Sequence, residues 1–344
     1  MEGVDFSNQK VLVRVDFNIE QSNIAAIEEH FRLSIAKKTI DFIAAAPGAK
    51  IALLTHFGRP EGKREESASV AKLVDAVERS LGRSVVFVPD CIGDSVKDAL
   101  DKLSENQVLL LENVRFYPEE EQNDAAFAEK LAAPFTLYVN EAFSVCHRAH
   151  ASVEAITRCL PAYAGLRLCE EIAELDRIRL HPEHPAIAII GGAKIETKLP
   201  LISALEKNYD AILVGGKVAN EAIDQKIAFS EKVLLPKDFD SDLRLDIGPQ
   251  TVAYYTQIIA TAKTIIWNGP MGKFEEKPYD IGTEAILYAL LKSEAYVVIG
   301  GGESLAVLEK ADAIKKVSFV SSGGGAMLEY LGGKVLPGLL VLAA

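Results

Sequence analysis

The chain of 344 residues contains few of the features that mark secreted or membrane proteins. Its four cysteines form no CxxC pair and are too few for a disulfide scaffold. No apolar run approaches the roughly 20 residues needed to cross a bilayer, and the polar start MEGVDFSNQK lacks the apolar core of a signal peptide. We therefore expect a cytoplasmic protein without membrane contact, and free thiols at Cys91, Cys146, Cys159 and Cys169.

Positive charge is also scarce in this sequence. The 37 Lys and Arg residues are outnumbered by 49 Asp and Glu residues, so the formal net charge is −12. Such a balance argues against a broad surface for nucleic acid or for a membrane. Any anion that this protein binds must therefore be held by a local cluster of Arg, Lys or His side chains.

Two common glycine motifs are absent as well. The sequence has no GxxxxGK[ST], which excludes a P-loop, and no GxGxxG after the first predicted strand. The second absence weighs against a nicotinamide-dependent dehydrogenase. That class stays as a rival interpretation, and it predicts binding of NADH.

The sequence does contain a regular alternation of short β-branched runs and longer amphipathic segments. Runs such as KVLVRVDF and KIALLTHFG come before residue 160, and runs such as AIAIIGG and YVVIGGG follow residue 184. This alternation predicts parallel sheets covered by helices on both faces. About five strands in the first half and six in the second fit two doubly wound α/β domains, with one eight-stranded barrel as the second choice.

A charged segment links the two predicted domains. The stretch RLCEEIAELDRIRLHPEHP predicts a helix over residues 167–184, because the prolines at its end cannot continue it. The domains would then span residues 1–166 and 185–326. The remaining tail, residues 327–344, ends in an apolar, strand-like stretch that must dock on another part of the chain.

Basic side chains follow the predicted strands of the first half. In open parallel sheets, ligands bind beyond the carboxyl ends of the strands, and these ends carry His56, Arg59, Arg115 and Arg148. Each has an ordinary explanation by itself, such as a buried, satisfied histidine for His56. Together they predict a cradle for a small multiply charged anion, because guanidinium forks suit carboxylate and phosphate. The CHRAH segment lacks the second Cys/His cluster that a zinc site needs.

Glycines follow the predicted strands of the second half, in GGAKIETK, NGPMG, GGGES and SSGGG. Glycine lets the backbone approach a ligand closely, and free N–H groups at a helix N-terminus attract phosphate. Lys194 and Lys198 would lie one helical turn apart on one face. One such turn is a weak signal, but several in one domain predict a polyphosphate site.

Eight motifs occur in one order between residue 11 and about residue 338: VLVRVDFN, THFGRP, LLLENVRFYPEEE, YVNEAFSVCHRAHAS, IIGGAKIETKLPLI, IIWNGPMGKFE, VVIGGGES and VSSGGGAMLEYLGGKVLPG. In this order they resemble the phosphoglycerate kinase family. The resemblance implies two Rossmann-like domains joined by a hinge helix, with the tail returning to the first domain. It also implies a monomer that transfers the acyl phosphate of 1,3-bisphosphoglycerate to ADP, giving 3-phosphoglycerate and ATP with Mg²⁺.

The resemblance assigns residues to two binding sites. The triose site would comprise Asp16, Phe17, Asn18, Arg32, His56, Phe57, Gly58, Arg59, Arg115, His147 and Arg148. The nucleotide site would comprise Gly192, Lys194, Lys198, Gly215, Gly216, Asn268, Glu275, Gly300, Gly301, Gly302, Glu303, Ser304, Gly323, Gly324 and Gly325, with Glu303 as the Mg²⁺ ligand.

Catalysis would rest on Arg32, Lys194 and Lys198, which would neutralise the phosphoryl group in transfer. No general base is needed, because the carboxylate of 3-phosphoglycerate, with a pKa of about 4, is already ionised at neutral pH.

The sequence also departs from the family pattern. Glu303 and Ser304 replace the Asp and Thr of GGGDT, and Glu141 replaces the aspartate of VNDAF. Glu20 stands where the family has a proline, and the stretch from Gly216 to Gly248 is shorter than usual in a region that helps form the adenine pocket. Base specificity is therefore left open. These departures motivate an alternative, a catalytically silent relative that acts as a binding or scaffold protein; the retained cations count against it.

Overall fold

The computed structural model describes residue 1, residues 3–19 and residues 31–342. Glu20, one of the departures from the family pattern, lies outside the described residues. The chain divides into two compact units. Unit 1 comprises Met1–Glu170 and Leu336–Ala344, and unit 2 comprises Glu171–Val335.

Within the described residues, unit 1 contains one six-stranded parallel sheet with the strand order β3-β4-β2-β1-β5-β6. Its strands are β1 (Lys10–Arg14), β2 (Lys50–Leu54), β3 (Ser84–Val88), β4 (Gln107–Leu111), β5 (Leu137–Asn140) and β6 (Ala162–Ala164). Its α-helices are α1 (Phe31–Ser34), α2 (Lys37–Ala44), α3 (Val74–Leu81), α4 (Asp94–Lys102), α5 (Pro118–Glu121), α6 (Ala125–Ala132) and α14 (Pro337–Leu340). Short 3₁₀ helices are η2 (Glu66–Ala68), η3 (Val70–Leu73), η4 (Val114–Phe116), η5 (Phe143–Val145) and η6 (Ala155–Arg158).

Alternate residues of the strands in unit 1 pack on opposite faces of the sheet. On β1, Val11 and Val13 join a buried cluster that includes Val77 of α3. Leu12, which lies between them, joins a second cluster that includes Leu100 of α4. Because helices cover both faces, the strands read as nearly continuous apolar runs in the sequence.

Unit 2 is built on the same plan and also contains a six-stranded parallel sheet in its described residues, with the order β12-β11-β10-β7-β8-β9. Its strands are β7 (Ala186–Ile190), β8 (Ala211–Val214), β9 (Val233–Leu234), β10 (Thr264–Asn268), β11 (Tyr296–Gly300) and β12 (Phe319–Ser321). Its helices are α8 (Leu199–Leu205), α9 (Gly216–Asp224), α10 (Pro249–Ile259), α11 (Ile281–Lys292), α12 (Gly302–Lys310) and α13 (Gly324–Leu331), with 3₁₀ helices η7 (Ile195–Thr197) and η8 (Ile314–Lys316).

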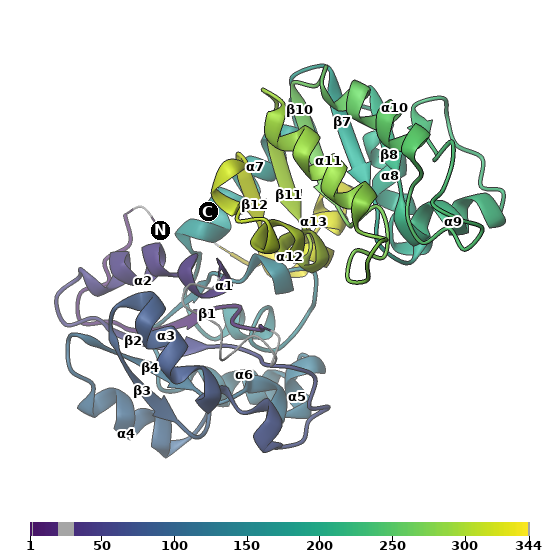
Figure 1. The fold of residues 1–344 in the computed structure, drawn as a ribbon. Helices are drawn as coiled ribbons and strands as arrows, with labels where there is room; N and C mark the ends of the chain where they lie inside the picture. Colours follow the sequence, from purple (N-terminus) through teal and green to yellow (C-terminus); the bar gives the residue numbers. More distant parts are fainter. Residues whose placement is uncertain (2, 20–30, 343–344) are drawn as a thin grey trace. The chain divides into compact units, whose positions relative to one another are not determined.

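The strand order of unit 2 is that of the Rossmann fold. The sheet extends from β7 toward β9 on one side and from β10 toward β12 on the other, so the topological switch point lies between β7 and β10. Figure 1 shows β7, β10 and β11 side by side, with α10 and α11 packed together in the same unit. The two sheets confirm the expected α/β class with two doubly wound parallel sheets, and the single barrel is wrong. The structure adds β6, a three-residue strand that the sequence pattern did not reveal.

The boundary between the units lies within α7 (Leu166–Leu180), between Glu170 and Glu171. The tail was expected from residue 327, but α13 continues in unit 2 to Leu331, and only Leu336 onward belongs to unit 1. The expectation of a strand-like tail is wrong, because Pro337 occupies the first turn of the helix α14, where its missing N–H costs nothing.

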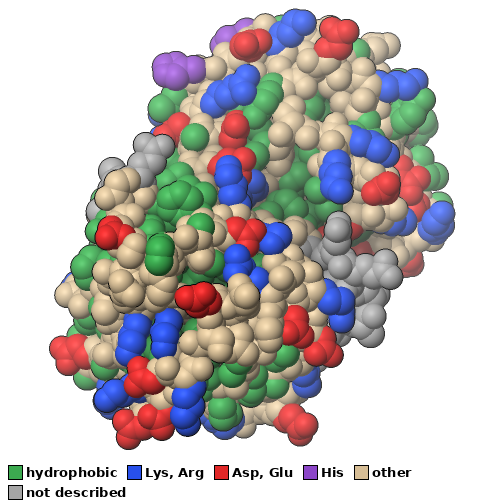
Figure 2. All heavy atoms as spheres, turned by 90° about the vertical axis from the view of Figure 1, so that its left-hand side faces the viewer, with side chains coloured by type: hydrophobic (Ala, Val, Ile, Leu, Met, Phe, Trp, Pro, Cys, Tyr) green, Lys and Arg blue, Asp and Glu red, His purple; other side chains and the backbone are tan. Residues whose placement is uncertain are grey.

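The surface carries charges of both signs. On the face in Figure 2, Lys and Arg side chains are interspersed with Asp and Glu side chains. No helix in the described part of the chain is long and apolar enough to span a membrane. Cys91 and Cys146 are buried free thiols, and Cys159 and Cys169 are exposed free thiols.

Candidate active site

The predicted anion cradle of unit 1 comes from the carboxyl ends of its four central strands. Among the predicted residues, His56 follows β2, Arg115 follows β4 and Arg148 follows β5; the structure adds Arg14, the last residue of β1. These strands are neighbours in the order β4-β2-β1-β5. Since parallel strands end at one edge, side chains distant in the sequence are brought together there.

Asp16 organises one side of this edge. Its carboxylate accepts hydrogen bonds from the guanidinium of Arg32, the hydroxyl of Ser144 and the backbone N–H of Asn18, the last at 3.1 Å. Burial would raise the pKa of Asp16, but the charge of Arg32 and these hydrogen bonds lower it well below its ordinary value. Asp16 is therefore an ionised carboxylate that positions Arg32.

Positive charge accumulates at the same edge without full neutralisation. Arg115 is 4% exposed, and its Nη1 donates to the carbonyl of Gly58 at 2.9 Å. Burial first, and then the charges of Arg14 and Arg148, lower the pKa of Arg115 to about 10. We call Arg14, Arg115 and Arg148 the arginine cluster. Because these guanidiniums repel one another across a partly desolvated space, an anion bound among them would relieve the repulsion.

Three other predicted residues, Phe17, Asn18 and Phe57, help to hold the strand ends in place. Phe17 and Phe57 are buried, and the backbone N–H of Phe17 donates to the hydroxyl of Thr55. The side chain of Asn18 accepts from the N–H of Gly58 at 2.8 Å, which ties the end of β1 to the turn after β2. These contacts shape the strand ends rather than present charge.

Arg59 and His147 differ from the rest of the predicted triose site. Arg59 is exposed and makes no hydrogen bond or ion pair to any other described residue. His147 accepts a hydrogen bond at Nε2 from Nε of Arg148 at 3.2 Å, so it orients that guanidinium. Their roles toward a ligand stay predictions.

In unit 2, the predicted glycine turns follow five adjacent strands, β12, β11, β10, β7 and β8. Two of these glycines are required by close approach. A Cβ on Gly269, whose φ is +88°, would lie 2.4 Å from the carbonyl carbon of Gly191. A Cβ on Gly216, whose φ is +60°, would lie 2.8 Å from the carbonyl oxygen of Pro270. The turns after β7, β8 and β10 therefore touch one another through their backbones, which larger residues would prevent.

Lys198 is the buried cation of this edge. It is 7% exposed, and its ammonium donates to the side-chain oxygen of Asn268, whose amide in turn donates to the carbonyl of Gly300 at 2.6 Å. Burial lowers the pKa of Lys198 to about 8, against the charge of Glu303, which raises it. Asn268 thereby links the ends of β7, β10 and β11.

The expectation that Lys194 and Lys198 share one helical face is wrong. Lys194 has a φ of +66° and precedes η7, so the two residues are not on one helix. Lys194 is exposed, whereas Lys198 is buried. A role for Lys194 toward a nucleotide stays a prediction.

The N-terminus of α12 brings a carboxylate to the same edge. Burial and the charge of Glu275 raise the pKa of Glu303, and Lys198 lowers it less. Ser304 is buried and accepts a hydrogen bond from the N–H of Gly269 at 2.8 Å, so its hydroxyl holds a glycine turn. The turn before α13 lies alongside, since a Cβ on Gly324 would contact Gly301 at 3.4 Å.

Glu303 and Glu275 suit a cation that is also held by the phosphates of a bound substrate. Among the described residues there is no group of three His, Cys, Asp or Glu side chains that could hold a metal ion. The charge of Glu275 raises the pKa of Glu303, and Lys198 offsets this only in part. Mg²⁺ is commonly held by one or two carboxylates together with substrate phosphates, so this pair suits a nucleotide-bound Mg²⁺.

Asp246 is a buried residue of this region that sequence reasoning missed. Its carboxylate accepts from the N–H of Gly282 at 2.7 Å and from that of Ile247 at 2.9 Å. Burial, with smaller effects of Asp240 and Asp280, raises its pKa to about 6. Asp246 thus ties the start of α11 to the segment before α10. Nothing in its sequence context distinguishes it from an ordinary surface aspartate.

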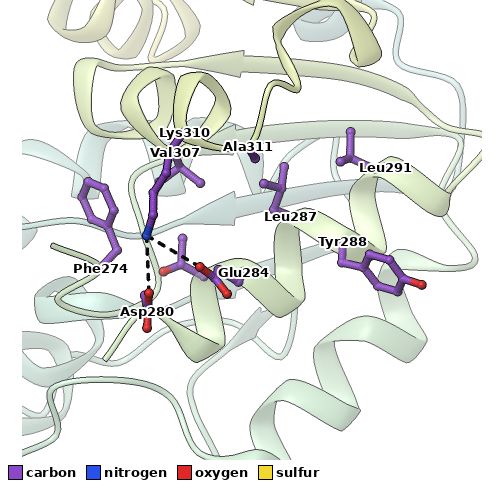
Figure 3. Close-up of a pocket in the computed structure, with 10 residues that line it drawn as sticks. Phe274, Asp280, Glu284, Leu287, Tyr288, Leu291, Val307, Lys310 and Ala311 are labelled. Carbon is purple, nitrogen blue, oxygen red and sulfur yellow. Dashed lines mark hydrogen bonds and ion pairs between the residues drawn. The ribbon is translucent and has the colours of Figure 1, made fainter. Parts of the chain in front are cut away.

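A separate apolar hollow of about 290 Å³ lies between α11 and α12. Figure 3 shows Lys310 at its edge, paired with Asp280 and Glu284. The ammonium lies 3.4 Å from the carboxylate of Asp280 and 3.7 Å from that of Glu284. None of the residues predicted to bind a ligand lines this hollow. The candidate site is therefore defined by the strand ends and not by this cavity.

Fold and strand ends place the chain in a class of two-unit α/β proteins, with clustered arginines on one open sheet and glycine turns on the other. The family model described as phosphoglycerate kinase matches residues 1–238 and 221–334. The chain belongs to the phosphoglycerate kinase family.

Known relatives agree along nearly the whole length. The chain is 37% identical to phosphoglycerate kinase of Moorella thermoacetica, over 99% of this chain and 98% of the relative. It is 39% identical to that of Geobacter metallireducens, over 97% and 95%. The crystal structure of phosphoglycerate kinase from Pyrococcus horikoshii matches with a TM-score of 0.88 and 29% identity, over 99% and 98% of the two chains. The structure of phosphoglycerate kinase from Coxiella burnetii matches with a TM-score of 0.79 and 30% identity, over 99% and 97% of the two chains.

The alignments also bear on the shortened region. They run over 387 and 380 positions, more than the 344 residues of this chain, so the relatives carry residues that it lacks. The two segments matched by the family model overlap at residues 221–238, inside the stretch from Gly216 to Gly248. In this chain that stretch still forms α9 and the two-residue edge strand β9.

Proposed function

We propose that this chain catalyses reversible phosphoryl transfer between 1,3-bisphosphoglycerate and ADP, giving 3-phosphoglycerate and ATP. The observation that carries the proposal is the arginine cluster at one sheet edge of a chain in this family, beside the carboxylate-positioned Arg32. Three guanidiniums gathered at one sheet edge suit a ligand with both phosphate and carboxylate charges. A scaffold protein would have no use for this arrangement.

In the direction of ATP formation, an oxygen of the β-phosphate of ADP forms a bond to the transferred phosphorus. The bond from that phosphorus to the acyl oxygen breaks, and the carboxylate of 3-phosphoglycerate leaves. No proton moves, so the protein need only position and neutralise charge. Arg32, oriented by Asp16, and the buried ammonium of Lys198 are the groups assigned to this task.

On unit 2, the glycine turns and the start of α12 would receive the phosphates of the nucleotide through backbone N–H groups. Glu303, with Glu275 near it, would hold the Mg²⁺ that accompanies the nucleotide. The metal supplies neutralisation of the phosphate charge. Asn268 and Glu275 would lie near the ribose, and Gly215 and Gly216 would contact the nucleotide.

The coupled assay of 3-phosphoglycerate phosphorylation with Mg·ATP, repeated with Mg·GTP, tests the proposal. Turnover with ATP alone would mean that the shortened region still distinguishes adenine, and equal turnover with both would mean that it does not. Absence of turnover from folded protein would favour the silent relative. Lys198→Ala should reduce kcat by at least about 100-fold, the scale of a lost preorganised charge contact, and Lys310→Ala, outside the site, serves as the matched control.

The proposed setting is cytoplasmic and monomeric. Support for the first comes from the four free thiols, two of them exposed. Light scattering of the purified chain would test the second.

A further inference from the structure

Arg14 is one of the largest fully buried side chains of the molecule, and none of the triose-site assignments includes it. It is the last residue of β1 and is 1% exposed. Its Nε donates to the hydroxyl of Ser152 at 2.9 Å, and its Nη1 donates to the backbone carbonyl of Val15. Its Nη2 lies 3.2 Å from Nδ1 of His56. A buried guanidinium is costly, so its contacts need an explanation.

The far side of Arg14 is neutralised by a second buried group. Ser152 donates its hydroxyl to Glu120 at 2.6 Å and its N–H to the same carboxylate at 2.8 Å. Burial would raise the pKa of Glu120, but His150, Arg14 and Ser152 together lower it. Glu120 is therefore ionised, and it fixes the guanidinium of Arg14 through Ser152. Ser152 and Glu120 thus fix the position of the Arg14 guanidinium next to His56.

The contact between Arg14 and His56 determines where the proton of the imidazole lies. A guanidinium can only donate hydrogen bonds. At 3.2 Å, Nδ1 of His56 must therefore be the acceptor, and it carries no proton. The carboxylate of Asp16 lies 3.9 Å from the same nitrogen, too far to compete by a hydrogen bond. A neutral imidazole has one N–H, which must then be at Nε2.

The charges around His56 keep the ring neutral. Burial contributes most to a pKa well below the ordinary value, and Arg14, Arg115 and Arg148 lower it further. Asp16 is the opposing group and raises it. The ring is therefore neutral at neutral pH.

We propose that Arg14 is a positioning residue that locks His56 in the neutral Nε2–H tautomer, so that His56 presents a fixed hydrogen-bond donor to the anionic substrate. No described residue makes a hydrogen bond to Nε2 of His56, so this donor is available to a ligand. The role of His56 as a ligand contact rests on the proposed function. The Nε2–H tautomer of His56, and the role of Arg14 in fixing it, do not depend on the proposed function.

The direct test is a long-range ¹H–¹⁵N correlation spectrum of the imidazoles in the ¹⁵N-labelled full chain, recorded from pH 6 to 8. The signal of His56 is assigned by its loss in His56→Gln. We expect one nitrogen of the pyrrole type, Nε2, and one unprotonated nitrogen, Nδ1, unchanged over this range. A protonated Nδ1, a cationic ring or averaging of the two tautomers in the wild-type chain would overturn the proposal.

Arg14→Met removes the donor and should mix the two tautomers. Arg14→Lys keeps a donor and should restore part of the Nε2–H signal. Arg83→Met is the matched control, because Arg83 is a partly buried arginine of the same unit that pairs with Asp41 instead. It should leave the His56 signals unchanged. A pure Nε2–H tautomer in a folded Arg14→Met variant would refute the role of Arg14.

Two further variants leave Arg14 in place and keep the test open if Arg14→Met does not fold. The amide nitrogen of a glutamine reaches the position of Nε2, whereas that of an asparagine does not. His56→Gln should therefore retain the affinity for 3-phosphoglycerate better than His56→Asn, by about 3- to 10-fold, the effect of one hydrogen bond. Equal losses would contradict a donor at Nε2. Failure of the proposed function would appear separately, as a wild-type chain without turnover whose His56 spectrum is nonetheless as expected.

Discussion

The ammonium of Lys198 has a pKa close to the working pH, which makes its charge testable. Burial lowers this pKa to about 8, so in the free protein Lys198 is protonated below that pH and loses its charge above it. If the charge is needed, kcat/KM for Mg·ATP, which reports the free protein, should fall as the pH rises through about 8. In Lys198→Arg the guanidinium stays charged, so the fall should vanish although the plateau is lower. A wild-type profile that is flat to pH 9.5 would remove Lys198 from this role.

Single residues also show where reasoning from the sequence succeeds and where it fails. Arg115 and Arg148 were predicted together because each follows a strand, and parallel strands of one sheet end at one edge. Arg14 lies inside an apolar strand run and not after its end. Nothing in the sequence therefore distinguished it from an arginine on the surface. Lys194 was misjudged because its positive φ of 66°, which the sequence does not reveal, breaks the helical spacing.

At the scale of one element, the start of α12 depends on glycine at one position and not at the next. Gly301 has a φ of +107°, and a Cβ there would lie 2.8 Å from Nδ2 of Asn268, whereas a Cβ on Gly302 would meet nothing within 4 Å. Gly301→Ala should lower the free energy of unfolding by about 1–3 kcal/mol. Gly302→Ala should leave it unchanged or raise it by up to about 1 kcal/mol, because alanine favours the helix. Urea unfolding compares them, and equal losses would contradict the assigned strain.

The start of α7 is capped by Glu141, the residue that replaces an aspartate of the family pattern. Its carboxylate accepts from the N–H of Arg167 at 3.1 Å and of Leu168 at 3.3 Å, and from the hydroxyl of Thr39. Burial outweighs these bonds and raises its pKa from 4.5 to about 7. The folded state thus holds this proton more tightly than the unfolded state.

The stabilisation that Glu141 provides is therefore fully present below pH 4.5 and is lost as the pH rises through about 7. We expect the free energy of unfolding to fall by up to about 3 kcal/mol over this range because of this group. Glu141→Gln cannot titrate, so its unfolding energy should change less over the same range. Urea unfolding at pH 4.5 and 7 measures the difference, and parallel curves for the two chains would show that Glu141 does not titrate as described.

At the scale of the whole molecule, the sequence indicated the class of fold but not all boundaries. Continuous apolar runs and glycine-ended helices are local features, and they predicted the two sheets and the end of α3 at Gly82, which has a φ of +66°. The three-residue strand β6 was not predicted, because so short a run forms a strand only where a neighbouring strand pairs with it. The tail was misjudged because its apolar residues are explained by the surface on which they dock and not by any periodicity of their own.

Because the tail docks on unit 1, that unit consists of two separate segments of the chain, whereas unit 2 is one continuous segment. Leu336 is 1% exposed, Leu342 packs against the buried cluster behind the sheet, and the N–H of Gly338 donates to the carbonyl of Cys146 at 2.9 Å. A Cβ on Gly338 would lie 2.6 Å from the side chain of Val153, so the tail fits closely. Burial of a leucine contributes about 1.5–3 kcal/mol. Removal of residues 336–344 should therefore destabilise unit 1 by about 2–4 kcal/mol and leave unit 2 unchanged.

Hydrogen exchange of the full and shortened chains measures both units in one experiment. Amides of β1 and β5 in unit 1 should lose protection in the shortened chain, while those of β7 and β10 in unit 2 keep theirs. The continuous fragment 171–335 should fold by itself, whereas 1–170 should regain full protection only when a peptide of residues 336–344 is added. Equal loss of protection in both sheets would mean that the two units unfold as one cooperative body and that the tail stabilises the chain as a whole.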